Sequence, residues 1–138
     1  MNLKRAVRIS IVMYVISFLL GLIPMFVMGI DPSQVAELPA KYFIIGIVTS
    51  IILSGLFSLL YFKGERVKRS AKEGFYFGLA LITVGFILDV IIFSITYITT
   101  DAQMDIFSYY ANPFFWIALI LVICTATIAG AIMRKKTI

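Results

Sequence analysis

The stretch that decides the fold is GFYFGLALITVGFILDVIIFSITYI, which runs from Gly74 to Ile98 and contains a single charged side chain, Asp89. An α-helix of roughly 20 apolar residues spans the hydrocarbon core of a bilayer, which is about 30 Å thick. A soluble protein has no need of so long an apolar helix, because one of its faces would meet water. The stretch therefore predicts a helix that crosses a membrane.

Three more apolar blocks predict the same kind of helix. Together the four blocks place transmembrane helices at about residues 6–28, 42–62, 74–98 and 113–133. The chain is 62% hydrophobic and 14% charged, against about 45–50% and about 25% in typical soluble domains. The blocks are too long and too few to be strands of a closed barrel, the other structure that satisfies every backbone group in a bilayer. We expect one domain, an all-α integral membrane protein folded as an antiparallel bundle of four transmembrane helices.

The segments between the blocks also carry signals. Pro24 is expected to kink or end the first helix, whereas Pro113 suits the first turn of the fourth. The linkers that follow the first and third blocks are long enough to hold a short helix or a partner contact. The first block has a basic start, as signal peptides do, but its apolar run exceeds the 7–15 residues of a signal core. We therefore expect it to remain as the first helix.

The basic residues gather on one predicted side of the membrane. All but Lys41 of the 12 lysines and arginines lie in the N-terminal segment, in the loop between the second and third helices, or at the C-terminus. Because basic residues stay cytoplasmic, both termini are predicted to be cytoplasmic. This asymmetry explains the net charge of +5 without nucleic acid. Apart from this topological role, five loop residues are candidates for contact with anionic lipid headgroups: Lys63, Arg66, Lys68, Arg69 and Lys72.

Asp89 is the acid that lies deep within an apolar block. It follows the cytoplasmic end of its helix by about 15 residues, which places it roughly 22 Å into the bilayer. An ionisable group there costs about 2.5–3.5 kcal/mol on insertion scales, so it is expected to face the protein interior. Gly74, Gly78 and Gly85 fall on the same helical face, and the spacing of the first two lets helix backbones approach closely. We predict that these three glycines form a helix-packing face.

The expected partners of Asp89 are hydroxyl groups. No lysine or histidine lies inside any block, and Arg8 lies at the start of the first block, far from the depth of Asp89. We predict an intramembrane polar cluster in which the neutral carboxyl donates a hydrogen bond. Tyr14 lies on a polar face of the first helix, and Tyr109 and Tyr110 are interpreted as anchors at the membrane surface. Counting inward from the helix ends places these members of the cluster at similar depths: Asp89, Ser17, Ser50, Ser54 and Thr125.

The sequence offers little for catalysis or metal binding. It has no histidine, and its one cysteine, Cys124, lies in an apolar run without an obvious activating base. No phosphate-binding loop is present. We expect no catalytic site, no metal site and no cofactor, and hence not an enzyme.

Three classes of function remain. A structural or accessory subunit of the membrane best fits the lack of chemistry. A small proton- or ion-coupled transporter or channel, working as a homo-oligomer, best fits Asp89. A membrane enzyme is a distant third.

The segment Lys72-Glu73-Gly74, followed by Gly78 and then by Leu88-Asp89, resembles a loose group of small four-helix membrane proteins of bacteria and archaea. The resemblance covers mainly the third helix. It implies a prokaryotic cytoplasmic membrane and no particular activity. Small multidrug exporters share the size but rely on an acid in the first helix, where this chain has none. Fluoride channels need a glycine-rich, arginine-bearing pattern that is also missing.

Overall fold

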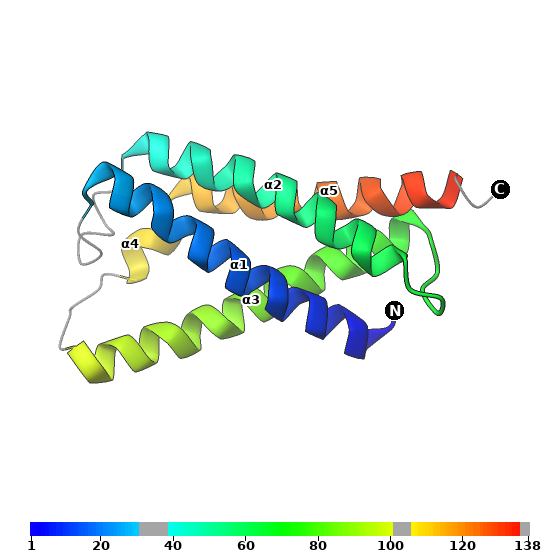
Figure 1. Ribbon diagram of the computed structural model, residues 1–138, viewed down its shortest axis with the longest axis horizontal. Coiled ribbons are helices and arrows are strands. Elements are labelled where there is room, and N and C mark those ends of the chain that lie inside the picture. Colours follow the sequence, from blue (N-terminus) through cyan, green and yellow to red (C-terminus); the bar gives the residue numbers. More distant parts are fainter. Residues whose placement is uncertain (31–38, 101–105, 136–138) are drawn as a thin grey trace.

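The computed structural model describes residues 1–30, 39–100 and 106–135. All elements in these ranges are helices, and four of them are long and apolar enough to cross a membrane. The structure thus confirms the predicted all-helical chain with four apolar spans (Figure 1). The helices are α1 (Leu3–Met28), α2 (Ala40–Phe62), α3 (Ala71–Thr100), the short α4 (Ile106–Ala111) and α5 (Pro113–Lys135).

Some helices extend past the apolar blocks because side chains cap their first turns. The Asn2 side chain accepts a hydrogen bond of 3.2 Å from the backbone N–H of Arg5, so α1 begins at Leu3. The Ser70 hydroxyl accepts one of 3.1 Å from the backbone N–H of Glu73 at the start of α3. At its other end, α1 continues through Pro24 and stops before Gly29, whose φ of 63° glycine adopts without a steric penalty.

The second linker contains α4, the short helix for which its length left room. It is followed at once by α5, which begins at Pro113 as predicted. Proline suits this position because the first turn of a helix leaves its backbone N–H groups without intrahelical partners. The two helices therefore share a tight corner, and α4 packs against α5.

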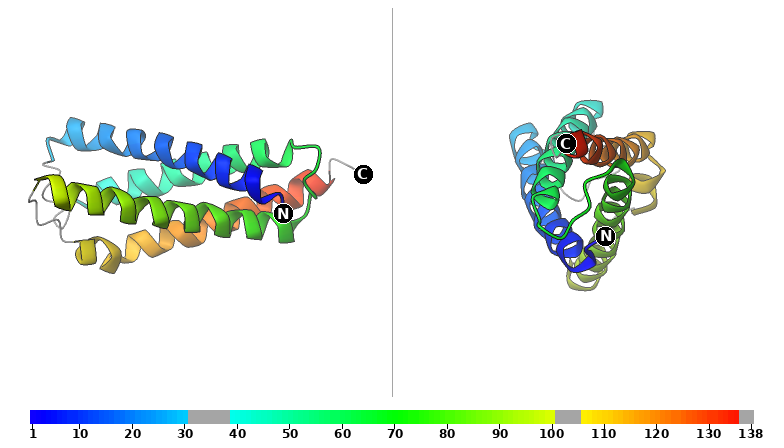
Figure 2. Two further views of the ribbon diagram at one scale, coloured as in Figure 1. Left: turned by 90° about the horizontal axis from the view of Figure 1, so that it is seen from below. Right: turned by 90° about the vertical axis from the view of Figure 1, so that its right-hand side faces the viewer.

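The long helices lie side by side, and each runs opposite to the one before it (Figure 1). α5 makes the most extensive contacts, with α3 and with α2, while α1 contacts α2 and α3. The contact between α2 and α3 is slight. α1 begins and α5 ends at the same end of the molecule (Figures 1 and 2). We call the half at this end the core half, and the opposite half, which holds α4, the cavity half.

The tightly packed core occupies the core half. Tyr61, Phe62 and Phe77 are fully buried, and the rings of Tyr61 and Phe77 stack with their centroids 4.2 Å apart. Stacked aromatic rings combine a large buried apolar area with a favourable ring–ring term. The buried apolar cluster consists of Ala6, Met13, Leu53, Phe57, Tyr61, Phe62, Val67, Phe77, Leu81, Val122, Ala126 and Ala129.

Two glycines bring α3 and α5 close together in this half. A Cβ atom on Gly74 would collide with the carbonyl oxygen of Ala126, and one on Gly78 would lie 3.0 Å from the Cα atom of Ile123. Gly85 differs, since its nearest neighbour would be a ring carbon of Tyr14 at 3.8 Å. The predicted packing face therefore meets α5 at Gly74 and Gly78, while Gly85 faces α1.

Large apolar side chains cover the outer surface of all four long helices. Phe26 is 78% exposed and Ile98 is 79% exposed, and both lie within apolar spans. Water-soluble monomers rarely expose apolar patches on this scale. The surface is suited to contact with lipid chains.

Candidate functional site: a polar spot in an apolar cavity

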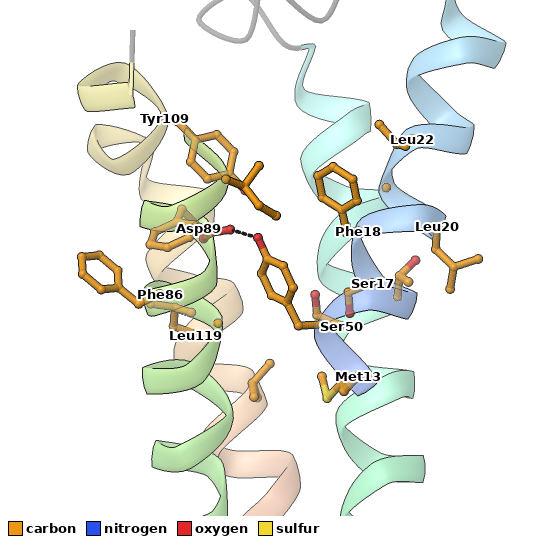
Figure 3. Close-up of a pocket in the computed structure, with 18 of the residues that line it drawn as sticks. Met13, Ser17, Phe18, Leu20, Leu22, Ser50, Phe86, Asp89, Tyr109 and Leu119 are labelled. Carbon is orange, nitrogen blue, oxygen red and sulfur yellow. Dashed lines mark hydrogen bonds between the residues drawn. The ribbon is translucent and has the colours of Figure 1, made fainter. Parts of the chain in front are cut away.

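The cavity half contains a half-open cavity of about 750 Å³. It lies among α1, α2, α3 and α5, and Tyr109 of α4 also lines it (Figure 3). Most of the wall is aliphatic or aromatic, with Phe18, Phe86 and Leu119 as examples. Pockets of roughly 300–1,000 Å³ with mainly apolar walls and a few polar groups are typical of small-molecule sites.

Asp89 is the charged residue on this wall. Its carboxyl accepts a hydrogen bond of 2.5 Å from the Tyr14 hydroxyl at Oδ1, which the dashed line in Figure 3 marks. The Tyr110 hydroxyl donates a longer bond of 3.4 Å to Oδ2. Asp89 is half-buried, and no ion pair to it occurs within the described residues. One carboxyl thus links α3 to α1 and to α4.

This arrangement can hold the carboxyl in either protonation state. A charged carboxylate accepts from both phenols, and a neutral acid can donate to either phenol oxygen, because a hydroxyl both donates and accepts. The Tyr110 hydroxyl keeps its proton at neutral pH, since burial and the nearby Asp89 charge raise its pKa to about 12. Burial and the same charge also raise the pKa of Tyr109. The site is therefore chemically able to bind and release a proton or to receive a cation.

A hydrogen bond and several ring contacts fix the position of α4 next to this site. The indole N–H of Trp116 donates a hydrogen bond of 2.8 Å to the Tyr110 carbonyl. The Tyr110 ring lies 5.0 Å from that of Phe115 and 5.7 Å from that of Phe86 on α3, measured between centroids. These contacts fix Tyr110 where it can reach Asp89.

The structure divides the residues of the predicted polar cluster. Ser17 and Ser50 line the cavity together with Asp89 (Figure 3). Ser54 and Thr125 instead donate to backbone carbonyls of their own helices, those of Ile51 and Leu121 at 3.0 and 2.7 Å, and lie outside the cavity wall. Hydroxyls in helices commonly bond back one turn in this way, which removes them as partners for another helix.

Within the described residues, the hydrogen-bond partners of Asp89 are two tyrosines, which the sequence analysis did not assign to it. Tyr14 lies on the predicted polar face of the first helix, and this face was the signal that could have identified it. Tyr110 gave no such signal, because an aromatic residue near a helix end is most simply an interfacial anchor. Tyr110 reaches Asp89 because of the angle between α4 and α5, and no sequence pattern predicts that angle.

A second polar cluster lies in the core half. The Tyr61 hydroxyl donates a hydrogen bond of 2.6 Å to Oε1 of the buried Glu73, and the amino group of Met1 lies 3.3 Å from Oε2. Arg5 donates to the carbonyls of Leu60 and Tyr61 at the end of α2, at 2.6 and 3.1 Å. Both oxygens of the Glu73 carboxylate thus have partners, so this cluster ties α1, α2 and α3 together and is structural.

The basic residues of the loop between α2 and α3 lie at the core-half end. Lys63, Arg66, Lys68 and Lys72 are exposed. Arg69 is half-buried, and its Nε–H donates a hydrogen bond of 3.3 Å to the Phe62 carbonyl. Contact of these five residues with anionic lipid stays a prediction.

In the described part of the chain, no three Cys, His, Asp or Glu side chains gather where they could hold a metal ion. Comparisons with protein-family models, with curated proteins and with solved structures find no match for this chain.

Proposed function

We propose that this chain is a small proton- or ion-coupled transporter or channel in which Asp89 binds a proton or cation that crosses the membrane. The observation that supports the proposal is the half-open cavity that reaches the Asp89 carboxyl between four helices. An ionisable side chain at membrane depth is costly, and such residues commonly mark proton and ion pathways. A structural role alone would not require a cavity beside the carboxyl.

The charge asymmetry supports an antiparallel four-helix arrangement with both termini in the cytoplasm. The start of α1, the end of α5 and the basic loop lie at the core-half end (Figure 1), and basic residues stay on the cytoplasmic side. In this orientation the cavity lies in the half of the membrane away from the cytoplasm. The tight core half then separates the cavity from the cytoplasm in the state that the structure represents.

Transport requires the site to change its access, and the contacts of Asp89 suit such a change. Asp89 joins α1, α3 and α4 through two phenols. Binding a proton or cation at the carboxyl alters which of these bonds can form, so it can alter the packing of three helices. We propose a homo-oligomer, because the cavity between the four helices is closed off by the tightly packed core half and does not by itself cross the molecule. The resemblance noted in the sequence supports the cytoplasmic membrane of a prokaryote as its location.

Flux through liposomes tests this function without knowledge of a solute. Purified protein is reconstituted, a pH gradient is imposed, and proton and sodium fluxes are followed with dyes. We expect pH-dependent flux that is lost in Asp89→Asn, whose side chain keeps the shape but cannot ionise. The matched control is Thr83→Val, because the Thr83 hydroxyl is exposed on the same helix and bonds to the Leu79 carbonyl. The proposal fails if Asp89→Asn matches the wild type, or if wild type does not exceed empty liposomes.

A structural or accessory subunit is the second candidate. It is favoured by the close packing of α3 on α5 at Gly74 and Gly78 and by the satisfied Glu73 cluster, which make a stable module. Purification from native membranes in a mild detergent would then recover a partner protein at fixed stoichiometry. The same preparation would show no flux of its own.

A further inference from the structure

We propose that the cavity binds an amphipathic organic amine that enters from the lipid between α1 and α3 and places its ammonium group at Asp89. This inference rests on the proposed function, since it names the class of solute that the same carboxyl would bind. Two observations support the inference: the composition of the cavity wall and the contacts between the helices that surround the cavity.

The wall suits a cation with an apolar body. Among the residues that line the cavity, Asp89 carries the one carboxyl group and none is basic. A buried charge needs a partner of opposite sign, so the wall favours a cation and disfavours an anion. The rings of Phe18, Phe86 and Phe115 also line it, and the faces of aromatic rings attract cations. The remaining aliphatic surface matches a hydrocarbon or aryl group rather than a hydrated metal ion.

Contacts join neighbouring helices on three sides of the cavity half. Between α1 and α2, the Tyr42 hydroxyl donates a hydrogen bond of 3.4 Å to the Gly21 carbonyl. Between α2 and α5, the rings of Phe43 and Phe114 stack at 5.8 Å. Between α3 and the α4–α5 corner, the Tyr110 ring lies against Phe86 and Phe115, as described above.

The fourth side, between α1 and α3, is bridged by the bond from Tyr14 to Asp89. Beyond this bridge the two helices diverge toward their ends in the cavity half (Figures 1 and 2). The cavity wall continues along both of them, through Leu22 and Met25 on α1 and Ile92 and Phe93 on α3. We place the mouth of the half-open cavity between these parts of α1 and α3, on the side that would face lipid, where an amphipathic amine would concentrate.

The Tyr14–Asp89 bridge lies at the inner end of this opening. An ammonium group has N–H donors that can replace the Tyr14 hydroxyl at Oδ1 while the Tyr110 hydroxyl stays at Oδ2. Binding therefore exchanges one hydrogen bond for an ion pair with hydrogen bonds, which is stronger in an apolar setting. A neutral molecule of the same shape gains no such exchange.

Equilibrium binding with a matched pair of probes tests the ligand class. Tritiated phenylbutylamine and the neutral phenylbutanol are titrated onto protein in lipid nanodiscs, with empty nanodiscs as the baseline. We expect saturable amine binding that is at least about tenfold tighter than alcohol binding, as for a desolvated ion pair. Asp89→Asn should remove this preference, and Thr83→Val should keep it. Equal affinity for both probes in the wild type, or no saturable binding of the amine, overturns the proposal.

The entry route is tested by closing the opening. In a Cys124→Ser background, Leu22→Cys and Phe93→Cys are joined by a bis-maleimide that contains a cleavable disulfide. We expect amine association to slow by about tenfold or more, because the linker obstructs the route between the two helices, and to recover after cleavage. An unchanged rate with complete cross-linking would contradict entry between α1 and α3.

Tyr14→Phe, which removes the bridge but keeps the ring, should bind the amine at least as well as wild type.

These measurements separate the two proposals. Binding is measured without a gradient, and proton and sodium flux is measured both without and with phenylbutylamine. If flux depends on Asp89 but the amine shows no preference, the ligand assignment is wrong and the role of Asp89 in ion movement stands. If the amine binds at Asp89 but no flux occurs with or without it, the transport function is wrong and the binding site stands.

Discussion

The chemistry of the molecule centres on one carboxyl group. Asp89 lies within an apolar span, and the tyrosines that donate to it come from two other helices. Each phenol offers both a donor and an acceptor, so the carboxyl need not be left unpaired when its charge changes. A lysine or arginine partner would instead fix the charged form. The choice of tyrosine is thus suited to a residue that gains and loses a proton or cation.

Tyr14→Phe tests how much the hydrogen bond from Tyr14 to Asp89 contributes to stability. The change deletes the hydroxyl that donates to Oδ1 at 2.5 Å and leaves the ring in place. We expect a loss of about 1 kcal/mol in stability, the size usual for hydrogen bonds between membrane helices. Thermal unfolding in mild detergent measures it. Tyr97→Phe is the control, because Tyr97 is 66% exposed on α3. Equal unfolding temperatures for both variants would show that the Tyr14–Asp89 hydrogen bond does not contribute to stability.

Sequence reasoning could find Asp89 but not its surroundings. A lone acid in an apolar run is conspicuous because its desolvation is costly. From the sequence, the hydroxyl partners of Asp89 could be selected only by their depth in the membrane. Depth does not reveal that the Ser54 and Thr125 hydroxyls donate to backbone carbonyls of their own helices. A tyrosine side chain is long, so its hydroxyl lies far from the Cα position that a depth count uses. The cavity itself has no sequence pattern, because it arises where helices diverge.

At the scale of the helices, α3 has two different neighbours along its length. Near its start it packs on α5 at Gly74 and Gly78, and further along it faces α1 at Gly85. The first region needs small residues because backbones are in contact. The second region lines the cavity and leaves room beside the backbone. One helix therefore joins the tightly packed half of the molecule to the site.

Alanine substitutions at these glycines should separate the two regions. Gly74→Ala forces a methyl group into the Ala126 carbonyl, and we expect it to destabilise the protein by about 1–3 kcal/mol through overpacking. Gly85→Ala is the matched control, because its methyl group would meet Tyr14 at an ordinary distance of 3.8 Å and alanine favours the helix. Thermal unfolding of both variants checks this. A control that is destabilised as much as Gly74→Ala would contradict the difference in packing.

The helices themselves were predictable, whereas their ends and neighbours were not. Long apolar runs identify membrane-spanning helices, because backbone groups in the bilayer core have no water to bind and must form hydrogen bonds within the helix. Ends depend on local caps such as Asn2 and Ser70, which extend α1 and α3 beyond the apolar residues. The small-residue spacing predicted a close helix contact but could not assign α5 to Gly74 and α1 to Gly85, since sequence spacing carries no information on helix tilt.

The whole molecule is built from a tight half and an open half. The buried aromatic core and the Glu73 cluster lie in the core half, and the cavity lies at the other end. A transporter needs both parts, since a rigid region must hold helices together while others change their separation. The basic residues at the core-half end are the basis for the proposed direction of the molecule in the membrane.

Labelling of single cysteines tests that direction. In a Cys124→Ser background, we expect Lys41→Cys to react with a membrane-impermeant maleimide in intact cells. We expect Lys68→Cys to react only in inverted vesicles, because both side chains are exposed and lie on opposite sides of the predicted membrane. The reverse pattern would place the cavity in the cytoplasmic half and contradict the proposed orientation.

The most direct test of the claim that Asp89 is kept for function is the stability and assembly of Asp89→Leu beside wild type in mild detergent. The change removes a group whose burial costs about 2.5–3.5 kcal/mol, more than the two hydrogen bonds return. We predict a higher unfolding temperature, an unchanged oligomeric state and no flux, which together mark a residue retained at the expense of stability. A lower unfolding temperature or a dissociated assembly would show instead that Asp89 is a packing contact, and would contradict the proposed role.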